Sequence, residues 1–238
     1  MRTIGLIGGM SWESSAAYYR LINQGVRDRL GPLRSARLLL HSVDFGPIEQ
    51  AQRAGRWDDA ANILAAAAQC LQAGGADAWL LCTNTMHKVA PQVQAAVAIP
   101  FIHIADPVGQ AASQAGWRTV GLLGTAFTME QGFFKDFLAH QHGLQVLTPG
   151  AAQRAALHRI IYDELCVGVL NTASRQTVLD MIQSLAAQGA QAVILGCTEI
   201  SLLVAPGDTA VPLLDTTALH AAAAVDFLLD GLATGGAA

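Results

Sequence analysis

Charged residues are scarce in this chain. Only 13% of its 238 residues are Asp, Glu, Lys or Arg, the formal net charge is −4, and Lys and Arg form no cluster. Because nucleic acids and anionic membrane surfaces are bound by basic patches, neither is an expected partner. No apolar stretch reaches the roughly 18 residues that suggest a membrane span, and no signal-type segment is evident. We therefore expect a cytoplasmic protein that acts on a small molecule.

Cysteine is also rare, and the CxxC spacing of redox and metal sites is missing. The four cysteines are Cys70, Cys82, Cys166 and Cys197. Without a secretory context they are expected to be reduced. Cys70 and Cys166 lie in helical patterns and are expected to fill core space, whereas Cys82 and Cys197 each end an apolar strand. A zinc site that combined the last two with His87 would lack paired ligand spacing, so no metal is expected.

Cofactor motifs are missing as well. The Gly8-Gly9 loop does not extend to the GxGxxG pattern of dinucleotide-binding proteins. The only lysines are Lys88 and Lys135, and neither follows a strand in a way that suggests a pyridoxal Schiff base. We therefore expect no cofactor.

The chain contains an internal repeat with one cysteine in each half. RTIGLIG at 2–8 returns as RTVGLLG at 118–124, an offset of 118 − 2 = 116. GADAWLLCT, which includes Cys82, returns as GAQAVILGCT, which includes Cys197, an offset of 197 − 82 = 115. Nearly constant spacing predicts two similar domains related by pseudo-twofold symmetry.

Each predicted domain is an α/β domain, because short apolar runs alternate with longer helical patterns, which is typical of a parallel sheet. The first domain is predicted to comprise 1–98 plus 210–238 and the second 99–209, and the tail at 235–238 is expected to fray. The predicted strands are Thr3–Ile7, Arg37–Val43, Ala78–Leu81, Phe101–His103, Thr119–Leu123, Leu144–Leu147, Ala192–Leu195 and Val211–Leu214. The strongest predicted helices are Trp57–Gln72, Ala151–Leu170, Ser174–Gln188 and Ala218–Leu229.

Polar residues follow the cysteine-bearing strands. Ligands of parallel sheets bind at the carboxyl ends of strands, where Thr83, Asn84 and Thr85 follow Cys82, and Thr198 follows Cys197. These groups can hold a carboxylate and stabilise the negative charge that develops when its neighbouring carbon loses a proton. An alternative is that they only cap helices.

The paired cysteines suggest proton transfer on two faces of one carbon. One thiolate would remove a proton while the opposite thiol returns one, and helix N-termini after both cysteines are expected to lower their pKa. A lone cysteine nucleophile with His87 as its base is the alternative, although it does not explain the second cysteine.

Three motifs together resemble the aspartate/glutamate racemase family, most closely its broad-specificity amino-acid racemase branch. They are GGMSWES at 8–14, CTNTMHK at 82–88 and GCTEI at 196–200. The resemblance implies two like α/β domains and cofactor-independent racemisation, usually in a homodimer. By position, Cys82 and Cys197 would be the acid/base residues, with Thr83, Asn84, Thr85 and Thr198 on the α-carboxylate. The other residues that would lie at the substrate are Met10, Ser11, Gln52, Thr125 and Glu199.

Departures from the family pattern bear on the substrate. Aspartate-dedicated members have basic side chains where this chain has Gln52 and Cys166, with Arg53 as a possible substitute, and glutamate racemases have histidine in place of Glu199. The resemblance therefore implies acidic amino acids or a broader set. Open alternatives are a hydantoin racemase, a maleate isomerase, a malonate decarboxylase, and a protein that binds small carboxylates or senses thiol oxidation without catalysis.

Overall fold

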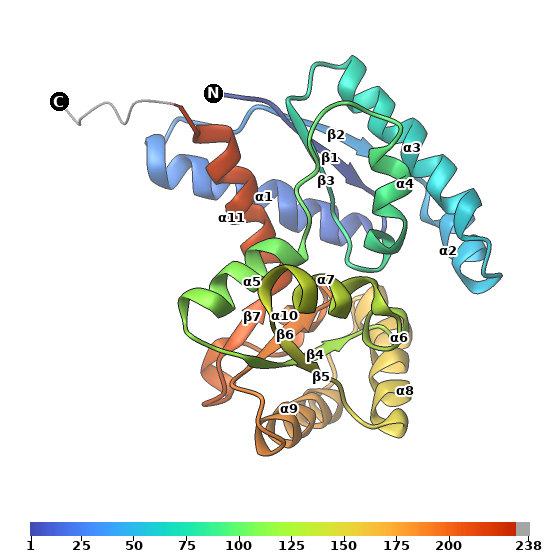
Figure 1. Cartoon of the computed structure of the whole chain (residues 1–238), viewed down its shortest axis with the longest axis vertical. Helices are drawn as coiled ribbons and strands as arrows, with labels where there is room; N and C mark the ends of the chain where they lie inside the picture. The colour runs from blue at the N-terminus through green and yellow to red at the C-terminus, as the bar shows by residue number, and fades with distance from the viewer. Residues whose placement is uncertain (232–238) are drawn as a thin grey trace. The chain divides into compact units, whose positions relative to one another are not determined.

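A computed structural model describes residues 1–231, so the predicted frayed tail at 235–238 lies outside the described residues (Figure 1). The chain forms two compact units. Unit 1 comprises 1–82, 89–102 and the described residues from Ala221 on, and unit 2 comprises 83–88 and 103–220. Compared with the predicted bounds, residues 83–88 and 210–220 fall in unit 2 and residues 99–102 fall in unit 1. Among residues 1–231, no helix is both long and apolar enough to span a membrane.

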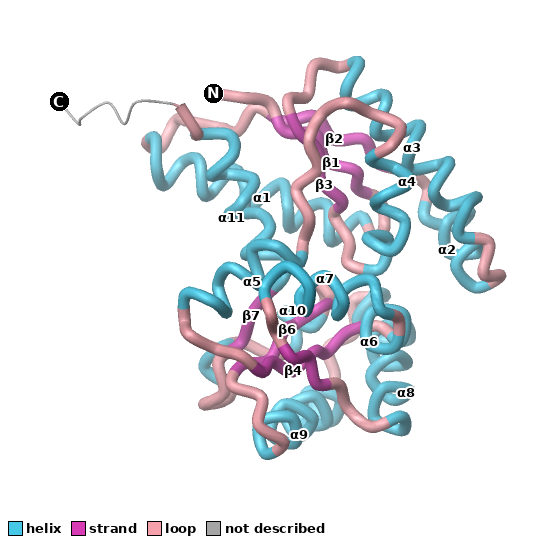
Figure 2. Tube along the Cα trace, in the orientation of Figure 1, coloured by secondary structure: helices cyan, strands magenta, loops and turns pink. Residues whose placement is uncertain are grey.

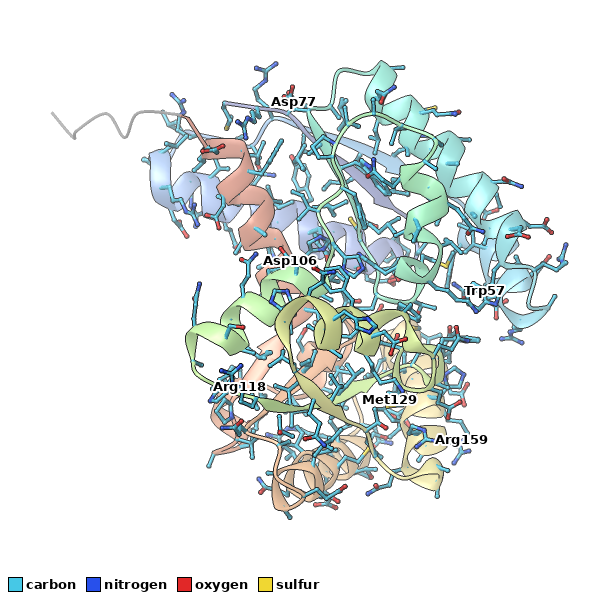
Figure 3. The ribbon with its side chains drawn as sticks, viewed as in Figure 1. Trp57, Asp77, Asp106, Arg118, Met129 and Arg159 are labelled. Atoms are coloured by element: carbon cyan, nitrogen blue, oxygen red, sulfur yellow. The ribbon has the colours of Figure 1, made fainter. Side chains whose placement is uncertain are left out.

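Unit 1 is built on a three-stranded parallel sheet in the order β2-β1-β3. The carboxylate of Asp77, labelled in Figure 3, accepts the Thr3 N–H at 2.6 Å and joins the beginnings of β1 and β3. The elements are β1 (Ile4–Gly8), α1 (Trp12–Leu30), β2 (Leu38–Ser42), α2 (Phe45–Arg53), α3 (Trp57–Ala73), β3 (Ala78–Leu81), α4 (Ala90–Gln94) and most of α11 (Thr216–Leu229).

Two of the three strands of unit 1 are buried along their whole length. Every residue of β1 and β3 is buried, as expected for a parallel sheet covered on both faces. Helices α1 and α11 lie side by side in Figure 1, and Tyr18 of α1 shares a core cluster with Val225 of α11 and Cys82. The end of β3 is therefore held in an apolar environment.

Unit 2 is built on a four-stranded parallel sheet in the order β5-β4-β6-β7, shown in magenta in Figure 2. Met129, labelled in Figure 3, is fully buried in its core. The elements are a 3-10 helix (Thr85–Val89), α5 (Ala105–Gln114), β4 (Thr119–Gly124), α6 (Ala126–Glu130), α7 (Gly132–His142), β5 (Gln145–Leu147), α8 (Ala151–Arg159), α9 (Thr172–Ala187), β6 (Ala192–Gly196), α10 (Ile200–Leu203), a 3-10 helix (Pro206–Asp208) and β7 (Leu213–Asp215).

Each unit repeats the same construction. β1 lies between β2 and β3 as β4 lies between β5 and β6. A Cβ on Gly5 of β1 would lie 2.9 Å from a Leu71 methyl carbon, and a Cβ on Gly121 of β4 would lie 2.9 Å from the same atom of Leu185. The repeated glycines thus allow one helix in each unit to pack closely on its sheet.

Several local predictions need correction. The predicted strand Phe101–His103 is reduced to one bridge between Phe101 and Trp79, because the chain turns into α5 at once. The predicted helix Ala151–Leu170 is α-helical only to Arg159 and continues as a π-helix and a 3-10 turn. Cys70 is exposed rather than in the core, because the buried stripe of α3 runs through neighbouring positions such as Ala67 and Leu71.

Candidate active site

The boundary between the units divides the predicted site residues at the peptide bond between Cys82 and Thr83. Unit 1 contains Met10, Ser11, Gln52 and Cys82. Unit 2 contains Thr83, Asn84, Thr85, Thr125, Cys197, Thr198 and Glu199.

The backbone of Cys82 is held on both sides. Its N–H donates to Ile7 O at 2.9 Å, and its carbonyl accepts the Ser14 hydroxyl at 2.7 Å. The Cys82 side chain is fully buried. Ser14 was not among the predicted residues, although its place in the motif GGMSWES is a signal that could have pointed to it.

The remaining predicted residues of unit 1 lie at the ends of β1 and α2. Met10 is buried, and Ser11 caps α1 by accepting the Ser14 N–H at 3.3 Å. The side chain of Gln52 is buried, whereas that of Arg53 is 76% exposed and forms an ion pair with Glu49. Of Gln52 and Arg53, only Gln52 is buried within the fold.

Cys197 follows β6 and has a carboxylate partner in its own unit. Its thiol donates to Glu199 Oε2 at 2.9 Å, and the Thr198 hydroxyl donates to the same oxygen at 2.5 Å. A thiol can make this bond only while it carries its proton. The single hydroxyl proton of Thr198 is also directed to Glu199, so in this arrangement it is not available to a carboxylate.

The segment 83–88 is tied into unit 2 by hydroxyl and amide contacts. Asn84 Nδ2 donates to Thr216 Oγ1 at 3.1 Å, and that hydroxyl donates to Leu195 O at 2.9 Å. Thr85 and Thr125 share a hydrogen bond of 3.2 Å between their hydroxyls. Thr216 was missed by sequence reasoning, because it follows a strand that carries no cysteine.

Thr125 also caps a helix, in the same way as Ser11 does in unit 1. It is the N-cap of α6 and accepts the Thr128 N–H at 3.3 Å. Helix capping is thus a structural role of Ser11 and Thr125, and it is compatible with binding.

Burial raises the pKa of both candidate thiols. For Cys82 burial alone is the cause. For Cys197 burial contributes most, followed by the negative charge of Glu199 and the hydrogen bond to it. The expectation that helix N-termini lower these pKa values is wrong, since the following helices, Thr85–Val89 and Ile200–Leu203, have only five and four residues.

Both ring nitrogens of His87 contact backbone groups of its own unit, which does not favour its role as the base of a lone nucleophile. Its Nδ1 lies 2.9 Å from Thr83 O, and its Nε2 accepts the Ile104 N–H at 3.1 Å. These bonds attach the ring to the backbone of unit 2.

Three parallel strands follow the same order in both units, β2-β1-β3 and β5-β4-β6, and a buried cysteine follows the last strand of each set. These features define a two-unit parallel α/β protein with a candidate thiol in each unit. The Asp/Glu/Hydantoin racemase family model matches residues 7–224, and the chain belongs to this family.

Solved structures support the same placement. A candidate Asp/Glu racemase from Yersinia pestis is 51% identical, with a TM-score of 0.91 over 97% of this chain and 100% of that one. An aspartate racemase homologue from Pyrococcus horikoshii is 31% identical, with a TM-score of 0.85 over the same shares. The fold is thus the two-domain fold of Asp/Glu racemases.

A curated relative matches over a shorter region. The glutamate racemase of a Roseiflexus species is 30% identical over 175 residues, which are 71% of this chain. The match spans 60% of the length of that relative.

Proposed function

We propose that this protein is a cofactor-independent amino-acid racemase in which Cys82 and Cys197 exchange protons with opposite faces of the substrate α-carbon. The observation that carries the proposal is the buried cysteine at the carboxyl end of β3 in unit 1 and of β6 in unit 2. Family membership and the racemases among the similar proteins support it. Two groups are needed because a proton removed from one face must be replaced from the other.

In the proposed mechanism, Glu199 takes the proton of Cys197 as this sulfur removes the α-hydrogen of one enantiomer. The contact of 2.9 Å between Cys197 Sγ and Glu199 Oε2 supports such a transfer. Cys82 remains a thiol because burial raises its pKa, and it gives its proton to the opposite face of the carbanion. The cycle closes when Cys82 gains a proton from solvent and Glu199 loses one. The reverse reaction follows the same steps backwards.

Asn84 is proposed to bind both charged groups of the substrate. Because the Thr216 hydroxyl donates to Leu195 O, it accepts from Nδ2 of Asn84, which leaves Oδ1 as the free end of the amide. Among the described residues Asn84 Oδ1 is buried without a hydrogen-bond partner. A buried oxygen that lacks a donor can accept a hydrogen bond from the α-ammonium group of the substrate. The main-chain N–H groups of Thr83–Thr85 can donate to its α-carboxylate.

Substrate range is proposed to include acidic amino acids and a broader set such as homoserine. Gln52 is buried and neutral, and Cys166 packs against the core that contains Cys197. Substituting Cys166→Lys would place a cation there, and we expect it to raise turnover of aspartate relative to a neutral amino acid. An unchanged ratio would remove Cys166 from the specificity determinants.

The direct test is to incubate the purified protein with L-aspartate, L-glutamate, L-homoserine and L-alanine in heavy water without added cofactor. We expect loss of optical activity, with solvent deuterium entering the product enantiomer before the remaining substrate. Equal early label in both enantiomers would contradict separate acid and base groups. Loss of activity after dialysis against a chelator would contradict cofactor independence.

The same assay separates the alternatives. A hydantoin racemase, a maleate isomerase or a malonate decarboxylase would leave the amino acids unchanged and consume its own substrate, and a decarboxylase would need one cysteine only. A thiol sensor would turn over none of these substrates and would lose free thiols on mild oxidation.

We further propose a cytoplasmic homodimer. All four cysteines are free, as expected in a reducing compartment. Trp12 and Tyr19 lie seven positions apart on α1, with 69% and 53% of their surfaces exposed, and would suit an interface between subunits. Light scattering after gel filtration should give twice the mass of 24.9 kDa. A single-chain mass would contradict the dimer.

A further inference from the structure

One tautomer of His87 satisfies the contacts of its two ring nitrogens with Thr83 O and the Ile104 N–H. The Ile104 N–H is a donor, so Nε2 at 3.1 Å from it must carry a lone pair. In a neutral ring the proton then lies on Nδ1, which donates to Thr83 O at 2.9 Å. His87 is therefore a neutral Nδ1–H imidazole that links two backbone groups of unit 2.

The surroundings of His87 favour this neutral form. The ring is buried, and burial lowers its pKa well below the usual value for histidine. The neighbouring rings of His103 and His220, with centroids at 4.7 and 6.0 Å, act in the same direction. The backbone hydrogen bonds to Thr83 and Asn84 act in the opposite direction and are outweighed.

The contact with Thr83 O sets the direction of a second group. Thr83 O and the Asn84 N–H belong to one peptide unit, and in a trans peptide they point in opposite directions. The only cis peptide bond among the described residues is Met10–Ser11, so the Thr83–Asn84 bond is trans. With Thr83 O held towards His87, the Asn84 N–H must point away from the ring.

We propose that His87 is a positioning residue, which orients the Thr83–Asn84 peptide so that the Asn84 N–H is presented to the substrate carboxylate. This inference rests on the proposed racemase function and adds the residue that sets the direction of one carboxylate donor. His87 acts through the backbone and does not touch the reacting carbon. The partial positive charge of the N–H faces an anion only while the peptide keeps this orientation.

Two substitutions separate the contacts of the ring. In His87→Asn the side-chain amide nitrogen takes the place of Nδ1 and can still donate to Thr83 O. In His87→Gln the amide oxygen takes the place of Nε2 and can accept only the Ile104 N–H. We expect the Asn variant to keep KM within about threefold of wild type and the Gln variant to raise KM about tenfold or more, with a smaller change in kcat. His140→Asn, at an exposed histidine of the same unit, is the control.

Thermal unfolding of each variant distinguishes positioning from general stabilisation. The proposal is overturned if the rise in KM correlates with the loss of Tm and not with the loss of the contact to Thr83 O. It is also overturned if both variants keep the wild-type KM.

Two NMR measurements on the wild-type protein test the proposal without turnover. Imidazole ¹⁵N shifts should show a protonated Nδ1 and an unprotonated Nε2 for His87, and titration with L-aspartate should shift the Asn84 amide resonance. The Asn84 shift should persist in His87→Asn and disappear in His87→Gln. An Nε2–H tautomer, or an Asn84 amide that does not respond to aspartate, overturns the inference. If both signals are as expected but no amino acid is racemised, the proposed function fails and the positioning of the donor stands.

Discussion

Cys82 and Cys197 occupy the same place in two copies of one topology but have different neighbours. Cys82 lies in an apolar core cluster with residues such as Leu6 and Tyr18, and burial is the sole cause of its raised pKa. Cys197 donates to a buried carboxylate two residues further along the chain. The repeat thus reproduces the backbone position of the cysteine, whereas, in the described part of the chain, only Cys197 has a carboxylate that accepts its thiol proton, that of Glu199.

The largest effect is expected from removing either thiol. Cys82→Ser and Cys197→Ser should each lower racemisation by about 10² to 10⁴-fold, because one proton-transfer group is lost and serine is a much weaker acid. Polarimetry with aspartate and homoserine gives the rates, and circular dichroism checks the fold. If either serine variant kept near wild-type turnover, the mechanism with two proton-transferring cysteines would be wrong.

A sharper comparison comes from Glu199→Gln. Removing the charge removes a cause of the raised pKa of Cys197, so its alkylation by iodoacetamide at pH 8 should become faster while that of Cys82 is unchanged. Racemisation should nevertheless fall by about tenfold to a hundredfold, because the proton acceptor is lost. Mass spectrometry of the labelled peptides gives both alkylation rates. Faster racemisation would show that Glu199 disfavours the Cys197 thiolate and does not act as its proton acceptor.

The pH dependence of stability should report both buried thiols. Their folded pKa values are raised, so their contribution to stability is complete below the ordinary thiol pKa of 9.0 and is lost as the pH rises towards the folded values. The free energy of unfolding should fall by up to about 1.4 kcal/mol per pH unit for each thiol. Urea unfolding between pH 8 and 10.5 measures this slope. Cys82→Ala should make it shallower, and an unchanged slope would contradict the assigned burial of Cys82.

The smallest effect is expected at Cys70, which is exposed on α3. Cys70→Ala should change the free energy of unfolding by less than about 0.5 kcal/mol and leave racemisation unchanged, since it opens no cavity. The same variant serves as the control for the pH series. A decrease of more than about 1 kcal/mol in the free energy of unfolding would instead support the core position that the helical pattern predicted.

Much of the fold was predictable because strand and helix patterns are local. The strand at Ala78–Leu81 was predicted with the bounds found in the structure, and the start of α3 at Trp57 was also predicted correctly. The hydrophobic pattern predicts burial less well where apolar residues occupy all sides of a helix. In α3 alanine occupies so many positions that periodicity did not identify the buried face, and Cys70 was placed on the wrong side.

By itself, the sequence determined the repeat, the parallel α/β class and the two cysteines at matched strand ends, because each follows from residue order and spacing. Only the tertiary structure decided that Ser14 holds the Cys82 carbonyl, that Thr216 holds Asn84, and that Glu199 accepts from Cys197. It also decided the direction of the thiol pKa shifts, since burial depends on residues far apart in the chain. Hydrogen-bond direction and desolvation are properties of neighbours in space, which spacing along a sequence does not record.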